Sequence, residues 1–289
     1  MRITILGHGV WGTALGKVLS ENGHEVNFWD KKSQIDPADF VVIALPTQAI
    51  RGVIKNYGRN LKKAIIINSA KGIEKESQKL PFQIVKELLG EEIEYFTLIG
   101  PSFAKEVGEK MPTLVNLGGY NGKMKEICNL FQTDYFRVRS THSVEALELA
   151  GALKNVYAIA CGVADGLGFG INTRAKLITI AYEEFQKLAK NLNYEIDGEA
   201  KPGILGDLVL TCSSTESRNF SFGKNLVSYS VKESIKKIDS TIEGYNTAFS
   251  ILYFSEKSPM PLSEFILRII EENNPRQVRA KFAEFVKMI

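Results

Sequence analysis

Three glycines near the N-terminus have the spacing of a phosphate-binding turn. Gly7, Gly9 and Gly12 follow the β-branched run 3–6 and precede the helical pattern that starts at 13–15. In such a unit the first glycine permits a tight turn, the second lets backbone N–H groups approach a pyrophosphate, and the third lets the helix pack on its strand. The anion then meets the positive end of the helix. The pattern predicts dinucleotide binding; the alternative is a glycine-rich turn in an unrelated α/β protein.

A carboxylate stands near the distance at which dinucleotide-binding proteins hold a ribose diol. The run 25–29 predicts a second strand and ends in Asp30, roughly twenty residues after the glycines. Asp30 favours the diol of NAD and repels the 2′-phosphate of NADP, whereas the adjacent Lys31 and Lys32 could receive that phosphate. Solvent screens the attraction of two exposed lysines. We therefore expect a preference for NAD over NADP.

A lysine lies on the apolar face of a predicted helix over residues 144–165. Positions 147, 150, 151, 154, 158 and 161 share this face, and Lys154 is its charged member. The other faces are also apolar, so the helix is expected to run through the centre of its domain. Two interpretations remain open. The lysine stem packs while its ammonium reaches solvent, or the ammonium points into a cleft, where it can donate to a carbonyl oxygen and exchange its proton.

Other polar residues follow a predicted strand or begin a predicted helix. Lys71 comes just after the strand 64–68, at the sheet edge where ligands bind, although it also fits a solvated loop lysine. Asp207 precedes the apolar residues 208–210 and could be a helix N-cap. The segment 217–219, Ser-Arg-Asn, offers a hydroxyl, a guanidinium and an amide. Arginine suits bidentate contact with phosphate, but an arginine in a surface loop fits the same pattern.

The elements that must position these residues change type along the chain. Up to about residue 140, β-branched runs alternate with helical stretches, as in a mostly parallel sheet. Further strands are predicted at 40–45, 64–68, 96–99, 113–117 and 135–138. Later helical patterns cover 144–165, 172–192, 243–256 and 262–272. We therefore predict an α/β dinucleotide-binding domain over residues 1–141 and an all-helical domain over residues 142–289.

Length and composition restrict the class of function. The 289 residues exceed the roughly 100 to 200 of one domain, and a net charge of +3 is too small to imply a nucleic-acid partner. The three cysteines match neither a disulfide framework nor a CxxC metal site, so we expect a reducing compartment. We expect no apolar run of the roughly 18 residues a membrane helix needs, and the N-terminus has the pattern of a core strand. These features favour a cytoplasmic protein that acts on metabolites without a metal.

Seven segments, in order along the chain, carry a family resemblance. They are GHGVWGTA at 7–14, NSAKGI at 68–73, GPSFAKE at 100–106, ALKNV at 152–156, ADGLG at 164–168, GDL at 206–208 and SRN at 217–219. The chain resembles bacterial NAD(P)-dependent glycerol-3-phosphate dehydrogenases from residue 3 to about Glu243. The resemblance implies a Rossmann domain and a helical domain like that of 6-phosphogluconate dehydrogenase. It also implies reversible reduction of dihydroxyacetone phosphate to sn-glycerol 3-phosphate for phospholipid synthesis, and a homodimer.

The resemblance further implies roles for individual residues. Lys154 would be the general acid in reduction and the proton acceptor in oxidation, with Lys71 and Asp207 as the other catalytic residues. The implied ligands of NAD or NADP are Gly7, Gly9, Val10, Trp11, Gly12, Asp30, Lys31, Lys71, Ala104, Arg218, Thr241 and Glu243. The implied substrate contacts are Lys71, Gly100, Ser102, Lys154, Asn155, Asp207, Thr211, Ser217, Arg218 and Asn219.

One stretch departs from the family pattern. Only ten residues separate Trp29 from Phe40, where the family usually has a helix, another strand and a loop over the adenine side. Two alternatives to this function stay open. One is a related Rossmann and helical-domain dehydrogenase acting on a keto acid such as ketopantoate, whose carboxylate Arg218 could bind. The other is a cofactor-binding pseudoenzyme, against which the presence of Lys71 and Lys154 argues.

Overall fold

The computed structural model describes residues 1–29, 34–238 and 240–289, which form two compact units. The first unit comprises Met1–Glu148 and Glu195–Ile204, and the second comprises Leu149–Tyr194 and Leu205–Ile289. Asp30 and Lys31 lie outside the described residues. The division between residues 141 and 142 stays a prediction.

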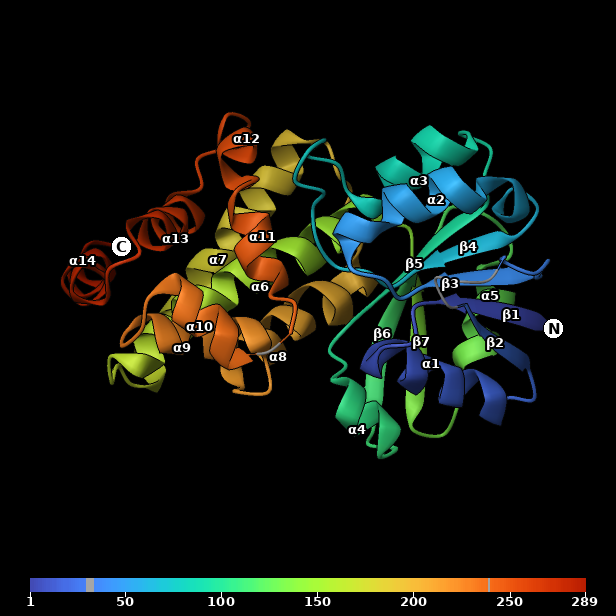
Figure 1. The fold of residues 1–289 in the computed structure, drawn as a ribbon, viewed down its shortest axis with the longest axis horizontal. Helices are drawn as coiled ribbons and strands as arrows, with labels where there is room; N and C mark the ends of the chain where they lie inside the picture. The colour runs from blue at the N-terminus through green and yellow to red at the C-terminus, as the bar shows by residue number, and fades with distance from the viewer. Residues whose placement is uncertain (30–33, 239) are drawn as a thin grey trace. The chain divides into compact units, whose positions relative to one another are not determined.

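Among the described residues, the first unit forms a seven-stranded sheet with helices on both faces (Figure 1). The strands are β1 (Arg2–Leu6), β2 (Glu25–Trp29), β3 (Phe40–Ile43), β4 (Ile65–Asn68), β5 (Tyr95–Ile99), β6 (Thr113–Gly118) and β7 (Phe136–Thr141). Their order is β2-β1-β3-β4-β5-β6-β7, and neighbours are parallel except for the antiparallel pair β5 and β6. The predicted mostly parallel sheet is confirmed. The chain changes direction across the sheet between β1 and β3, the position at which such sheets bind ligands.

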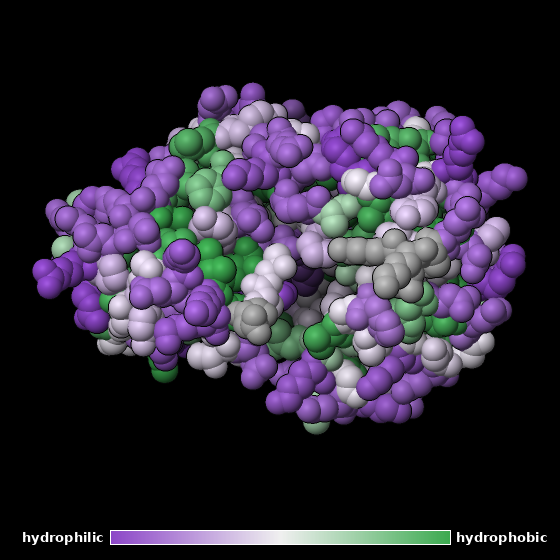
Figure 2. All heavy atoms as spheres, in the orientation of Figure 1, coloured by the Kyte–Doolittle hydropathy of each residue, from purple (hydrophilic) through white to green (hydrophobic). Residues whose placement is uncertain are grey.

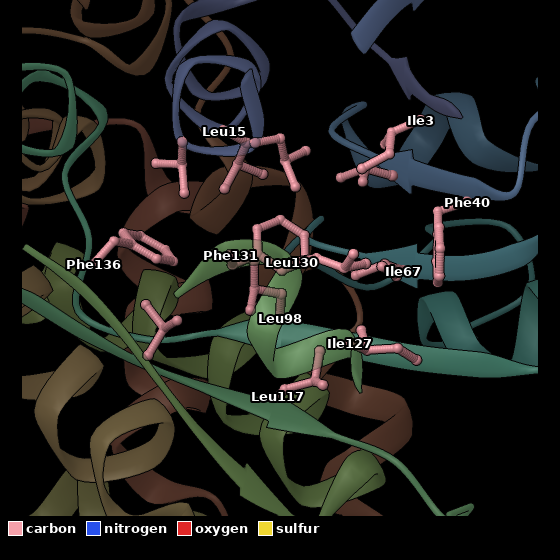
Figure 3. Packing of buried hydrophobic residues seen from close by; sticks show 14 of the residues in the cluster. Ile3, Leu15, Phe40, Ile67, Leu98, Leu117, Ile127, Leu130, Phe131 and Phe136 are labelled. Carbon is pink, nitrogen blue, oxygen red and sulfur yellow. The ribbon is translucent and has the colours of Figure 1, made fainter. Parts of the chain in front are cut away.

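Helices bury both faces of this sheet. One face carries α1 (Val10–Glu21), α4 (Ala104–Gly108) and α5 (Met124–Phe131), and the other carries α2 (Thr47–Leu61) and α3 (Pro81–Leu89). Successive strand residues alternate between the two cores: Val42 packs with α1 and α5, whereas Val41 and Ile43 pack with α2 and α3. Figure 3 shows part of the first core, including Leu15 of α1 and Phe131 of α5. Because both faces are covered, the central strands β3 and β5 are buried along their whole length and almost continuously apolar, whereas β2 and β7 carry exposed polar residues.

A later segment of the chain returns to the first unit through hydrogen bonds. The Asn116 side chain on β6 accepts from Gly203 N at 2.7 Å and donates to Glu199 O at 2.9 Å. Asp197 accepts from Thr141 Oγ1 at 2.7 Å and caps the short 3-10 helix Gly198–Ala200. Residues 195–204 therefore belong with the sheet although they follow two long helices.

The second unit is helical in its described part, as predicted. It contains most of α6 (Val144–Gly166) and all of α7 (Ile171–Asn191), α8 (Asp207–Ser213), α9 (Arg218–Leu226), α10 (Val231–Ile238), α11 (Glu243–Ala248), α12 (Ile251–Ser255), α13 (Pro261–Glu272) and α14 (Pro275–Met288). The π-helical turn Pro202–Gly206 leads into α8. The single helix predicted over 243–256 is wrong. Ser250 N bonds to Thr247 O, an i to i−3 contact that tightens the turn and separates α11 from α12.

Contrary to the expectation above, one helix meets the length and hydropathy of a membrane span. This helix is α6, and the whole of its apolar window is buried. A core helix of a globular unit passes the same test, and burial identifies α6 as such a helix. Hydrophilic residues cover most of the face drawn in Figure 2, with smaller apolar patches between them.

Two glycines bring α6 and α9 into backbone contact within the second unit. A Cβ on Gly223 of α9 would overlap the carbonyl oxygen of Ile159, and one on Gly162 of α6 would overlap that of Phe220. The helices therefore touch without side chains between them. This contact fixes the start of α9 relative to the middle of α6.

Candidate functional site

The glycine turn between β1 and α1 has the geometry that a pyrophosphate needs. Gly7 has a φ of +115°, and a Cβ there would lie 2.6 Å from Ala44 O. A Cβ on Gly12 would overlap the carbonyl oxygen of Gly7, whereas one on Gly9 would meet nothing within 4 Å. Gly9 is the N-cap of α1, and within the described chain no side chain caps this helix. The open space at Gly9 and the uncapped first turn, which includes the exposed Val10, fit a bound dinucleotide phosphate.

Polar groups connect the carboxyl ends of the neighbouring strands. The Trp11 indole donates to Ser69 Oγ at 3.1 Å, and that hydroxyl donates to Ile43 O at 2.8 Å. Lys71 Nζ donates to Gly100 O at 3.0 Å, and Ser102 Oγ donates to the same oxygen at 3.1 Å. The structure thus brings five predicted site residues of the first unit to one edge of the sheet: Gly9, Trp11, Lys71, Gly100 and Ser102.

A buried ion pair lies in the second unit. Lys154 is 7% exposed and Asp207 is 1% exposed. Lys154 Nζ donates to Asp207 Oδ1 at 2.5 Å and to Thr211 Oγ1 at 2.8 Å. Burial therefore excludes the interpretation in which the ammonium of Lys154 reaches solvent. The N-cap interpretation of Asp207 is wrong as well, because Gly206 is the N-cap of α8 and Asp207 is its first residue.

A second chain of hydrogen bonds begins one residue later on α6. Asn219 Nδ2 donates to Asn155 Oδ1 at 2.9 Å, and Gly244 N donates to Asn219 Oδ1 at 2.9 Å. This chain joins α6, α9 and α11 next to the buried ion pair. Asn219 is buried in this chain of hydrogen bonds, whereas the preceding residue, Arg218, is exposed.

Glu243 at the start of α11 has an unusual environment. Burial raises its pKa to about 7, and the positive charge of Arg218 opposes this shift. Its Oε2 is buried and has no hydrogen-bond partner among the described residues. A carboxyl group in this state is expected to gain from a ligand that donates a hydrogen bond to it.

Three other predicted residues have less distinctive places. Ser217 is the N-cap of α9, and its hydroxyl accepts from Phe220 N at 3.3 Å. Ala104 is the first residue of α4, and Thr241 is exposed before α11. Within the described ranges, no group of three or more His, Cys, Asp or Glu side chains could hold a metal ion.

Two buried polar residues that were not among the predicted site residues are linked by hydrogen bonds to the turn that carries Lys71. Asn68 ends β4, and Glu148 stands in the second turn of α6. Asn68 Nδ2 donates to Glu148 Oε1 at 2.9 Å. A carboxylate in an apolar helical pattern is the same kind of sequence signal as Lys154.

Comparisons with known proteins agree along nearly the whole chain. The family model described as "NAD-dependent glycerol-3-phosphate dehydrogenase N-terminus" matches residues 2–37 and 30–125, and the corresponding C-terminus model matches residues 143–280. Proteins named glycerol-3-phosphate dehydrogenase [NAD(P)+] from Leptospira biflexa and Malacoplasma penetrans are 33% and 32% identical. The alignments cover 96% and 98% of this chain, and 96% of each relative.

Solved structures give the same result. A glycerol-3-phosphate dehydrogenase from Coxiella burnetii superimposes with a TM-score of 0.87 at 30% identity, over 98% of each chain. A 2-dehydropantoate 2-reductase from Geobacter metallireducens reaches a TM-score of 0.57 at 16% identity, over 94% of this chain and 99% of its own. The second likeness concerns the fold alone.

Proposed function

Because this chain belongs to the NAD-dependent glycerol-3-phosphate dehydrogenase family, we propose that it catalyses the reversible reduction of dihydroxyacetone phosphate to sn-glycerol 3-phosphate with NADH or NADPH. The observation that carries the proposal is the buried contact of Lys154 with Asp207 and Thr211. The product supplies glycerophospholipid synthesis.

The reduction of a ketone needs a proton donor, and we assign this role to Lys154. When bound, the cofactor supplies the hydride that reduces the carbonyl carbon. The carbonyl oxygen would then hold a negative charge unless a neighbouring group protonates it. An ammonium is a donor that can give up its proton and take it back in the reverse reaction, a role worth about 10²- to 10⁴-fold. Asp207 and Thr211 accept hydrogen bonds from Nζ and so aim the ammonium.

The remaining substrate contacts follow from charge. Dihydroxyacetone phosphate carries an anionic phosphate, for which the exposed guanidinium of Arg218 is a suitable donor. The Asn155 and Asn219 side chains, held by their mutual hydrogen bond, are suited to contact the substrate beside it. We assign Lys71, Gly100 and Ser102 as further substrate contacts, supported by the shared hydrogen bonds of both side chains to Gly100 O.

We assign the glycine turn of the first unit to the cofactor. The turn that includes Gly7, Gly9 and Gly12 would hold the pyrophosphate, with Val10 and Trp11 in the first turn of α1. Glu243 and Arg218, with Ala104 and Thr241, are further proposed cofactor contacts. We propose a preference for NAD, supported by the carboxylate of Asp30. Among the described residues 34–39 that precede β3, none is helical.

Absorbance at 340 nm tests this function. The wild-type protein is expected to oxidise NADH or NADPH when dihydroxyacetone phosphate is added, and Lys154→Ala is expected to lose most of this turnover. Ketopantoate serves as the comparison substrate for the keto-acid alternative. Faster turnover with ketopantoate would replace the proposed substrate, and no turnover with either compound would indicate a cofactor-binding protein without activity.

We further propose a cytoplasmic homodimer that has no nucleic-acid partner and does not span a membrane. The small net charge argues against a nucleic-acid partner, and the burial of α6 argues against a membrane span. The cytoplasmic location and the homodimer rest on the sequence analysis alone. Light scattering during size-exclusion chromatography measures the oligomeric state, and a monomer at all concentrations would contradict the dimer.

A further inference from the structure

A buried carboxylate in the first unit lies beside the turn that carries Lys71. Glu148 is 1% exposed, and three donors surround it. Asn68 Nδ2 lies 2.9 Å from Oε1, Phe82 N lies 2.9 Å from Oε2, and the Tyr95 hydroxyl donates to Oε1. A carboxylate only accepts hydrogen bonds, so its ionised form matches these neighbours. Burial nevertheless raises the pKa of Glu148 to about 7, because the buried site disfavours the charged form that these donors favour.

The Asn68 side chain connects this carboxylate to the turn. Its Oδ1 accepts from Ala70 N at 2.9 Å, and its Nδ2 donates to Ala70 O at 3.1 Å as well as to Glu148. An amide has two donor hydrogens on nitrogen and an acceptor oxygen. If the amide turned over, its oxygen would face the Glu148 carboxylate and its NH₂ group would face Ala70 N. Glu148 and the Ala70 backbone therefore favour the same orientation of the Asn68 amide, and the hydrogen bond to Glu148 helps to hold the amide in contact with both backbone groups of Ala70.

Lys71 directly follows Ala70 in the chain. The Lys71 ammonium lies 3.0 Å from Gly100 O, at the carboxyl edge of the sheet. A change in the backbone at Ala70 would move the base of this side chain.

We propose that Glu148 is a positioning residue for the reaction, acting through Asn68 on the backbone that places Lys71. This inference rests on the proposed role of Lys71 in binding the substrate. Glu148 itself touches neither substrate nor cofactor in this proposal.

Two substitutions separate positioning from structural support. Glu148→Met keeps a similar length and removes both acceptors, so the Asn68 amide loses its hydrogen bond to residue 148 and is held only by Ala70. Glu148→Gln keeps one acceptor oxygen, which can face Asn68 and Tyr95, and gives up the contact with Phe82 N. We expect Glu148→Met to lower kcat/KM for dihydroxyacetone phosphate by about 10- to 100-fold, because a contact displaced by about 1 Å can cost up to roughly 100-fold. Glu148→Gln is expected to retain most of the activity, although we expect thermal unfolding to show that both variants are destabilised.

A double-mutant cycle with Lys71→Met identifies the route of the effect. If Glu148 acts through Lys71, then Glu148→Met causes little further loss of kcat/KM in the Lys71→Met background. Losses that multiply would overturn the inference, as would wild-type kcat/KM in Glu148→Met or equal losses in the Met and Gln variants. Wild-type activity in Lys71→Met alone would instead overturn the role of Lys71 and, with it, this inference. If Glu148→Met does not fold, Asn68→Ser replaces it in the same cycle, because serine is too short to reach Glu148 and the same outcomes apply.

Discussion

Replacing Lys154 by methionine should separate its catalytic role from its contribution to stability. The substitution keeps the length of the side chain but takes away the ammonium that balances the Asp207 carboxylate, which is 1% exposed. Removing one member of a buried ion pair costs about 3 to 5 kcal/mol, because the other charge stays buried. Asp207→Asn should cost a similar amount for the converse reason. The double variant Lys154→Met with Asp207→Asn removes both charges, so most of the lost free energy of unfolding should return.

Activity should follow a different pattern. We expect all three variants to lose about 10²- to 10⁴-fold in kcat/KM, since each removes the proton donor or the group that aims it. Urea unfolding followed by circular dichroism measures stability, and absorbance at 340 nm measures activity. Two results would refute the reasoning. A double variant no more stable than the single variants would show that the charges do not balance each other, and wild-type kcat/KM in Lys154→Met would show that another group supplies the proton.

Three further predictions concern the cofactor and pH. Gly9→Ala should leave the melting temperature unchanged, because its Cβ meets only open space in the protein, but should raise the Kd for NADH by roughly tenfold or more, because that space is the one proposed for the pyrophosphate. Gly12→Ala should lower the melting temperature as well, because its Cβ overlaps the Gly7 carbonyl. Wild-type affinity of Gly9→Ala in a fluorescence titration would contradict this prediction. The Glu243 carboxyl, with its raised pKa of about 7, binds its proton more tightly in the native state than in the unfolded state, so the wild type loses stability as pH rises from 5 to 8. Glu243→Gln does not titrate, and its free energy of unfolding should therefore rise relative to that of the wild type by up to about 3 kcal/mol over this range. The same difference in stability at pH 5 and pH 8 would exclude the effect. NADH should give a higher kcat/KM than NADPH, and steady-state kinetics with a tenfold preference for NADPH would reverse the proposed role of Asp30.

Local patterns were sufficient to predict the elements that carry the site. The glycine spacing at 7–12 and the apolar runs predicted the β1 to α1 turn, and the absence of later strand patterns predicted the helical second half. These features are short-range, since each depends on neighbouring residues and on a period of two or 3.6. The break between α11 and α12 was not predicted, because the i to i−3 bond at Ser250 leaves no periodic signal.

The contacts of the site depended on distant parts of the chain. Periodicity left Lys154 with two interpretations, and its partner Asp207 lies 53 positions later. Asp207 resembled an N-cap because the π-helical turn that precedes α8 is not visible as a pattern of residues. Glu148 and Asn68 are 80 positions apart, and nothing local indicates that the first turns of α6 approach the end of β4.

The backbone contact between α6 and α9 fixes the relative position of two helices that carry proposed substrate-binding residues. Gly223 lies five positions after Arg218, and Gly162 lies eight after Lys154, so the crossing of the two helices fixes how far apart the backbones at Lys154 and Arg218 lie. Side chains at an ordinary helix crossing can repack and let this distance change, but two touching main chains leave nothing to repack. In the binding mode that we propose, this fixed crossing limits the length of phosphate ester that can contact both Lys154 and Arg218.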